Sequence, residues 1–111
     1  MTQYAIADIG SNTIVLLVYE MVNHYPTPIL HISTPTHLID YVDGDRIMSK
    51  EGILKATEVL QSYADKLDEM HVQYRFADIT EPCRIQNKEE LVASLQATGW
   101  DIYPLSGNEE A

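Results

Sequence analysis

The sequence predicts an α/β fold in which helices flank a mixed β-sheet, and three observations support this. Short runs rich in β-branched and aromatic residues follow one another near the N-terminus, as expected for consecutive strands. One long stretch in the middle repeats its apolar residues every three or four positions, as an amphipathic helix does. The second half then alternates strand-like and helix-like segments, which is typical of parallel strands joined by right-handed crossovers.

Three strands are expected first, and their short connections predict an antiparallel meander. The first two strands are joined by a turn at Gly10-Ser11-Asn12. Pro26 and Pro28 then interrupt the chain before a third apolar run. Short connections favour antiparallel neighbours, because parallel strands need a crossover of about a dozen residues or more. The expected strands are residues 4–8, 14–21 and 29–33.

A long amphipathic helix is predicted after an irregular segment, 34–46, which contains the turn signal Asp43-Gly44-Asp45. Ser49 is placed to cap this helix, and Glu51 lies in its first turn, where the helix end is positive. The apolar spacing continues for about five turns. The apolar positions are Ile53, Ala56, Leu60, Tyr63, Leu67 and Met70.

Two more strands and a second helix complete the expected order. Asn87 and Glu90 have the spacing of a capping box at the start of the second helix, and Gly99 stands where that helix should stop. The two strands are residues 74–79 and 100–105, and a third helix is expected to open within 106–111. This β-β-β-α-β-α-β order matches the ribonuclease H-like architecture, as a single domain over residues 1–111. An architecture by itself does not fix a function.

Composition excludes several classes of partner and location. Seven Lys and Arg stand against 17 Asp and Glu, so the net charge is -10, and such a surface repels nucleic acid and anionic membranes. No run approaches the roughly 18 apolar residues of a membrane span, and no secretory signal is visible. A single cysteine, Cys83, excludes an intrachain disulfide and agrees with a cytoplasmic location. The four histidines lack zinc-ligand spacing with one another and with Cys83.

The segment Asp8-Ile9-Gly10-Ser11-Asn12-Thr13 admits two interpretations. Composition alone favours a tight hairpin turn, because Gly10 and Asn12 tolerate positive φ and Ser11 can bond its own backbone. The alternative is a phosphate-binding loop, in which glycine lets the backbone approach an anion and successive amides point at it. An acid at the end of the first strand would then hold a divalent cation or a water molecule.

Four motifs resemble those of one enzyme family, in the same order and with similar spacing over the whole chain. The first is Asp8-Ile9-Gly10-Ser11-Asn12-Thr13, and the last is Leu105-Ser106-Gly107-Asn108-Glu109-Glu110-Ala111, similar to the family's "I-S-G-x-E-E-A" signature. Ile47–Ile53 and Asn87–Leu91 resemble the family's two helix entries. The family is that of exopolyphosphatases and guanosine pentaphosphate phosphohydrolases, within the superfamily of actin, sugar kinases and heat-shock-70 chaperones.

This resemblance implies an N-terminal domain whose parent enzyme releases terminal phosphate from polyphosphate or guanosine pentaphosphate, with magnesium. The implied catalytic residue is Glu110, which would position or deprotonate the attacking water. Without the family, Glu109 and Glu110 would be first-turn acids that stabilise a helix N-terminus. Asp8 is the implied metal ligand. The implied phosphate-binding residues are Gly10, Ser11, Asn12, Thr13 and Arg84.

Two departures from the family pattern keep other functions open. Val15 occupies a position that is usually basic, and Arg84 lies three residues before Asn87 instead of four, so it is either a phosphate ligand or a surface residue. A non-catalytic phosphate- or nucleotide-binding regulator and a plain interaction domain are therefore the alternatives. No second "D-I-G-G-G-S" loop is present, so the chain is expected to be inactive alone. Its uncovered apolar surface would allow self-association into a homodimer.

Overall fold

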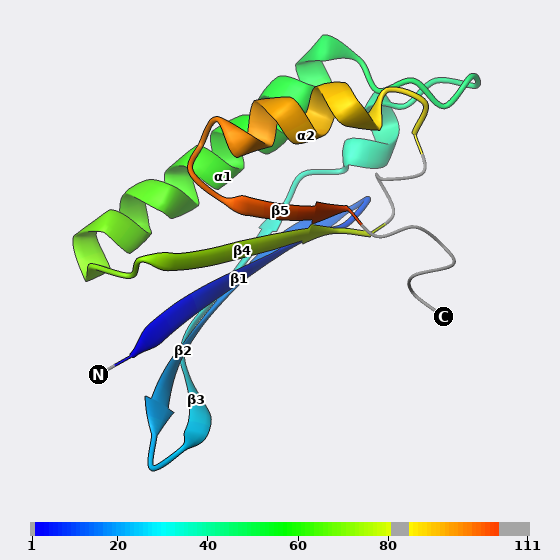
Figure 1. Ribbon diagram of the computed structural model, residues 1–111. Helices are drawn as coiled ribbons and strands as arrows, with labels where there is room; N and C mark the ends of the chain where they lie inside the picture. The colour runs from blue at the N-terminus through cyan, green and yellow to red at the C-terminus, as the bar shows by residue number, and fades with distance from the viewer. Residues whose placement is uncertain (1, 81–84, 105–111) are drawn as a thin grey trace.

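The computed structural model describes residues 2–80 and 85–104, which form one five-stranded sheet with two helices packed on it (Figure 1). The strand order is β3-β2-β1-β4-β5, which confirms the predicted ribonuclease H-like arrangement. The elements are β1 (Gln3–Ile9), β2 (Thr13–Val22), β3 (Tyr25–Pro35), a 3-10 helix η1 (Leu38–Tyr41), α1 (Lys50–Met70), β4 (Tyr74–Ile79), α2 (Lys88–Gln96) and β5 (Asp101–Pro104).

The sheet is antiparallel on one side of β1 and parallel on the other. β1 pairs antiparallel with β2, and β2 pairs antiparallel with β3, so the predicted meander is confirmed. β1 also pairs parallel with β4, and β4 pairs parallel with β5. Each parallel connection passes through a helix, as crossovers require. The parallel pairing places the carboxyl ends of the two inner strands β1 and β4 side by side at the same end of the sheet.

The hairpin between β2 and β3 corrects one sequence prediction. Pro26 and Pro28 do not interrupt the chain but lie inside β3, which runs over Tyr25–Pro35. β3 is the edge strand of the sheet, where a proline without an amide hydrogen is tolerated. The turn lies earlier, at Asn23 and His24, whose φ angles are 51° and 70°. Two positive φ angles are typical of the two-residue hairpin turn that matches strand twist.

Both helices begin or end at residues that the sequence singles out. Ser49 caps α1, and its Oγ accepts a hydrogen bond from the amide of Gly52 at 3.2 Å. His71, with φ of 62°, ends α1 in the left-handed conformation. Gly99, with φ of 93°, follows the end of α2, where the stop was expected. The predicted apolar stripe of α1 is buried at Ile53, Ala56, Leu60, Tyr63 and Leu67, and Met70 is partly buried.

The start of α2 differs from the expected capping box. No side-chain cap bond joins Asn87 to an amide of the helix. Its amide group instead binds the backbone of Met48, with Oδ1 accepting from the Met48 amide and Nδ2 donating to the Met48 carbonyl, both at 3.0 Å. Nδ2 also donates to Oε2 of Glu90 at 3.1 Å, so the predicted pair does meet. Asn87 therefore ties the start of α2 to the residue that precedes the cap of α1.

The core lies between the sheet and one layer of helices, because α1 and α2 cover the same face (Figure 1). In the described residues, no helix lies over the other face of the sheet. The strands alternate accordingly between buried and half-buried positions. The buried strand residues of β1, β2 and β4 are Ala5, Ala7, Ile9, Ile14, Leu16, Val18, Ala77 and Ile79.

Some predictions fall outside the described residues. These are the third helix within 106–111, which contains Glu109 and Glu110, and the loop residues Cys83 and Arg84. Within the described part, none of the helices has both the length and the apolar character needed to cross a membrane.

Candidate functional site

Two carboxylates lie side by side at the carboxyl ends of the central parallel strands. Asp8 is the penultimate residue of β1, and Asp78 is the penultimate residue of β4. The two are direct register partners in the parallel ladder. Their neighbours Ala7 and Ala77 are fully buried under the helices, so strand alternation turns Asp8 and Asp78 to the opposite, uncovered face. Asp8 is exposed there, whereas Asp78 is half-buried.

The environment of this pair disfavours two negative charges. Burial, the hydrogen bond with Asp8 and charge repulsion from Asp8 together raise the pKa of Asp78 from 3.8 to about 7, and burial is the largest of these causes. A hydrogen bond from the backbone opposes this rise. Near neutral pH, the pair therefore holds a proton in a large fraction of molecules. The Oδ1 atom of Asp78 is buried and has no hydrogen-bond partner among the described residues.

Nothing in the described part of the chain supplies a positive charge to this pair. Among the described residues, Asp8 is the charged group that shifts the pKa of Asp78, and it shifts it upward. Val15 is the register partner of Asp8 on β2, so its side chain lies on the same face. A basic residue at position 15 would therefore stand directly beside Asp8. Val15, Asp8 and Asp78 are paired side by side across three strands, and because valine is uncharged, the two acids are the charged groups among these three residues.

The loop after β1 is a tight turn that favours a glycine at its first position. The Gly10 amide donates to the carbonyl of Thr13 at 3.1 Å. A Cβ atom at Gly10 would also lie 3.1 Å from this carbonyl oxygen, which is closer than ordinary contact. The close approach explains why glycine stands here, and it confirms the predicted turn between the first two strands.

The Ser11 and Asn12 carbonyl groups of this loop accept hydrogen bonds from the segment that follows β3. The Asn12 carbonyl accepts from the amides of Thr36 and His37, each at 2.9 Å, and the Ser11 carbonyl accepts from the amide of Ile39 at 2.9 Å. Among the described residues, the amides of Ser11 and Asn12 have no such partner. Unpaired successive amides next to a glycine are the donors that a bound anion requires. The hairpin and phosphate-loop interpretations are therefore compatible, because the same turn provides both.

Thr80 brings the end of β4 to this loop. Its amide donates to the carbonyl of Ile9 at 3.2 Å, one residue before Gly10. The structure thus brings together Asp8, the loop from Gly10 to Thr13, and the start of the connection that leads to Arg84. Arg84 and Glu110 lie outside the described residues, so their placement in the site stays a prediction.

Asp78 is the site residue that sequence reasoning missed. It belongs to the strand 74–79, which was predicted correctly, but no motif marks it. The signal that could have identified it is the register: both aspartates are the penultimate residues of β1 and β4, which pair in parallel. Finding it would have required the relative alignment of β1 and β4, which a local motif does not contain.

The donor set fits a hard divalent cation of the kind the resemblance implies. Carboxylate oxygens are the preferred ligands of Mg²⁺, which commonly binds through one or two of them and keeps several waters. The unpartnered Oδ1 of Asp78 is a free oxygen of this type. No group of three or more His, Cys, Asp or Glu residues that could hold a metal occurs in the described ranges. Two carboxylates plus waters or phosphate oxygens would therefore complete the coordination.

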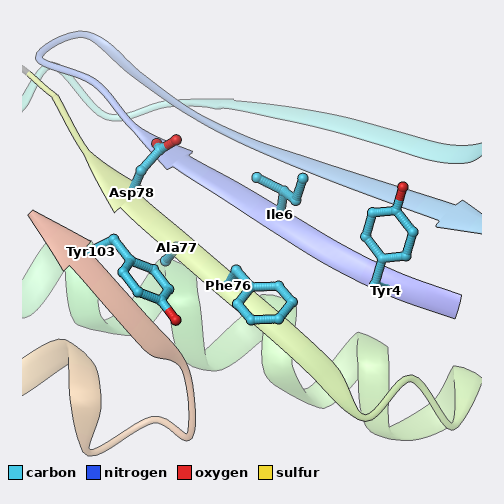
Figure 2. A pocket seen from close by; sticks show the side chains of 6 residues that line it. All are labelled: Tyr4, Ile6, Phe76, Ala77, Asp78 and Tyr103. Atoms are coloured by element: carbon cyan, nitrogen blue, oxygen red, sulfur yellow. The ribbon is translucent and has the colours of Figure 1, made fainter. Parts of the chain in front are cut away.

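An apolar, shallow pocket adjoins Asp78 on the uncovered face. Figure 2 shows its six side chains, with the Asp78 carboxyl group near the tip of the β1 arrow. The rings of Phe76 and Tyr103 form part of it, with centroids 6.2 Å apart. The remaining lining residues are Tyr4, Ile6 and Ala77.

Comparison with known proteins identifies structural relatives. No family model and no curated protein matches the sequence. A Ppx/GppA family member from Aquifex aeolicus superposes with a TM-score of 0.87 at 24% identity, covering 98% of this chain and 36% of its own. An exopolyphosphatase from Cytophaga hutchinsonii gives a TM-score of 0.88 at 23% identity, covering 96% and 35%.

Another structure, the Aquifex aeolicus PPX-GPPA enzyme, gives a TM-score of 0.80 at 25% identity, covering 93% of this chain and 36% of its own. The chain thus spans about a third of the length of these proteins. Over nearly its whole length, it has the ribonuclease H-like fold of a domain in the Ppx/GppA exopolyphosphatase structures.

Proposed function

We propose that this chain is the N-terminal, phosphate-binding domain of a phosphoanhydride hydrolase of the exopolyphosphatase type. The longer parent protein would release terminal phosphate from polyphosphate or guanosine pentaphosphate. The observation that supports this most directly is the loop after β1, where a carboxylate at the strand end is followed by two amides without a partner in the described part of the chain. The fold shared with exopolyphosphatase structures supports the same reaction class.

Each residue of the site has a role in this proposal. The amides of Ser11 and Asn12 and the Thr13 hydroxyl bind phosphate oxygens, while Gly10, whose amide donates to the Thr13 carbonyl, shapes the turn that presents them. Arg84 adds a positive charge from the connection after β4. Asp8 holds the divalent cation, which supplies charge neutralisation for the phosphate oxygens when bound. Glu110 orients the attacking water and accepts its proton.

The overall charge of the chain explains why this chemistry would have to be local. With a net charge of -10, the surface as a whole repels a polyanion. Attraction must come from backbone amides, from a bound cation and from the rest of the parent protein. The proposal therefore includes a second domain as the opposite wall of the site, and it places the parent in the cytoplasm, in keeping with a single cysteine.

Amide chemical shifts during a titration with tripolyphosphate and Mg²⁺ would test phosphate binding by this chain. We expect the largest changes at Ser11 and Asn12, because their amides have no hydrogen-bond partner among the described residues. Asn23 and His24 form the turn at the opposite end of β2 and should not respond, so they serve as the internal control. Changes of equal size at both turns, or no change at Ser11 and Asn12, would contradict the proposed site.

A non-catalytic phosphate-binding regulator is the second candidate, and Val15 favours it. This side chain lies beside Asp8 and brings no charge to the face where a phosphate would bind. Phosphate release from polyphosphate by the full-length parent, compared with its Glu110→Gln variant, separates the two functions. Turnover that falls at least a hundredfold in the variant supports hydrolysis. Binding of tripolyphosphate without any turnover by the parent supports the regulator.

A further inference from the structure

The end of β4 contains a polar atom for which the fold gives no explanation. The Oδ1 atom of Asp78 is buried, and no described residue bonds to it. Buried polar atoms are normally paired, and an unpaired one often marks a missing water or ion. The neighbouring group is Asp8, a second acid, which cannot satisfy a carboxylate oxygen when both are ionised.

The register makes this arrangement specific. Asp8 and Asp78 are direct partners across parallel strands, so their Cα atoms sit opposite each other and both side chains leave the same face. Asp8 is exposed and Asp78 is half-buried, so oxygen ligands would converge from the protein side while the solvent side stays open. The loop that contains Ser11 and Asn12, whose amides have no partner within residues 2–80 and 85–104, begins two residues after Asp8.

We propose that Asp78 and Asp8 together bind one hard divalent cation, Mg²⁺ or Mn²⁺, with Asp78 Oδ1 as a ligand that no sequence motif marks. The inference rests on the cation in the proposed function, and it adds a second protein ligand from β4. A positive ion between the strands satisfies the buried oxygen and removes the repulsion between the two acids. The open side leaves positions for waters or for phosphate oxygens, as Mg²⁺ sites usually have.

The chemistry of the pair selects the class of metal. Both ligands are carboxylates, and carboxylate and water ligands suit Mg²⁺, Ca²⁺ and Mn²⁺ better than softer ions. Within the described ranges, no His or Cys joins Asp and Glu in a metal-binding group. Zinc, which prefers nitrogen and sulfur ligands, is therefore not the expected occupant.

Calorimetric titration with Mn²⁺ tests this site in the absence of any phosphate. We expect one site in the wild-type chain, with a dissociation constant of about 0.1–1 mM, typical of weak carboxylate sites. Asp8→Asn and Asp78→Asn should each weaken binding at least tenfold. Asp101→Asn is the matched control, because it removes the same charge from an exposed position on β5 and should change affinity less than twofold.

A thermal-unfolding readout separates a metal ligand from a merely structural residue. Asp78→Asn should raise the melting temperature of the cation-free chain, because it removes repulsion, yet abolish the further rise that Mn²⁺ causes in the wild type. Circular dichroism confirms that the variant is folded. Wild-type affinity in Asp78→Asn, or no Mn²⁺ binding by the wild type at millimolar concentration, overturns the inference.

Its failure and that of the proposed function give different results. Mn²⁺ binding that needs both aspartates, with no amide response to tripolyphosphate, supports the cation site and rejects the phosphate loop. Amide shifts at Ser11 and Asn12, together with undiminished Mn²⁺ binding in Asp78→Asn, support the phosphate loop and reject the cation site.

Discussion

Asp78→Asn should stabilise the cation-free protein at neutral and alkaline pH and change it little near pH 4. Folding raises the pKa of Asp78 from 3.8 to about 7 through burial and the neighbouring Asp8. Below the unfolded pKa, the carboxyl group is protonated in both states and favours neither. As the pH rises from about 4 to about 7, the unfolded chain loses this proton first, so the wild type loses stability over that window. Asparagine cannot titrate, so the variant escapes this loss.

The raised pKa sets an upper limit on the effect. A shift from 3.8 to about 7 corresponds to about 4 kcal/mol of unfolding free energy above pH 7. Asp78 is only half-buried, so solvent screens its interaction with Asp8 and water solvates part of its charge. We therefore expect the variant to gain about 1–2 kcal/mol over the wild type at pH 8, after this discount.

Urea unfolding with a chelator present measures the difference directly. Trp100 is the only tryptophan and is 3% exposed, so its fluorescence should change on unfolding. The stability of the variant minus that of the wild type should be near zero at about pH 4, grow up to about pH 7 and level off by pH 8. Asp101→Asn should show no such growth. A stability difference between Asp78→Asn and the wild type that is constant with pH would refute the electrostatic explanation.

Three further changes probe the fold and the loop. Asn87→Ala removes both hydrogen bonds to the Met48 backbone and should cost about 1–3 kcal/mol in urea unfolding, because buried backbone groups lose their partner. Gly10→Ala adds a Cβ atom 3.1 Å from the Thr13 carbonyl oxygen, so the loop must shift and tripolyphosphate binding should weaken severalfold in calorimetry. Its cost to the free energy of unfolding should be smaller than that of Asn87→Ala. Val15→Arg places a positive charge beside Asp8 and should strengthen tripolyphosphate binding, by about tenfold for one charge-assisted hydrogen bond; unchanged affinity would argue that this face does not bind phosphate.

The fold could be predicted closely because its signals are local. The apolar spacing of α1 and the Ser49 cap lie within neighbouring turns of one helix, and both predictions were confirmed. Predictions went wrong where a distant partner decides the outcome. Pro26 is compatible with β3 only because β3 is an edge strand, and Asn87 bonds to Met48, 39 residues away, instead of capping its own helix.

In the candidate site too, the residues close together in sequence could be predicted, whereas the one that depends on a distant strand could not. Asp8 and the loop that follows it are contiguous in sequence, so they could be identified together. Asp78 joins them only through the register of β1 and β4, two strands that are separated in sequence by β2, β3 and α1. A slip of one residue in that register would turn Asp78 toward the helices. A local motif therefore could not predict the pair of carboxylates, although both strands were predicted correctly.

The position of the pair follows from the topology of the sheet. β1 is the strand where the antiparallel and parallel halves meet, so its carboxyl end leads into a tight turn while the end of β4 lies beside it. The helices cover the face that buries Ala7 and Ala77, so strand alternation places Asp8 and Asp78 on the other face. Among the described residues, no basic group lies beside them there. An acidic pair next to unpaired amides would repel a bare phosphate chain at close range. A divalent cation resolves this conflict, because it neutralises the acids and attracts the anion that the amides can hold.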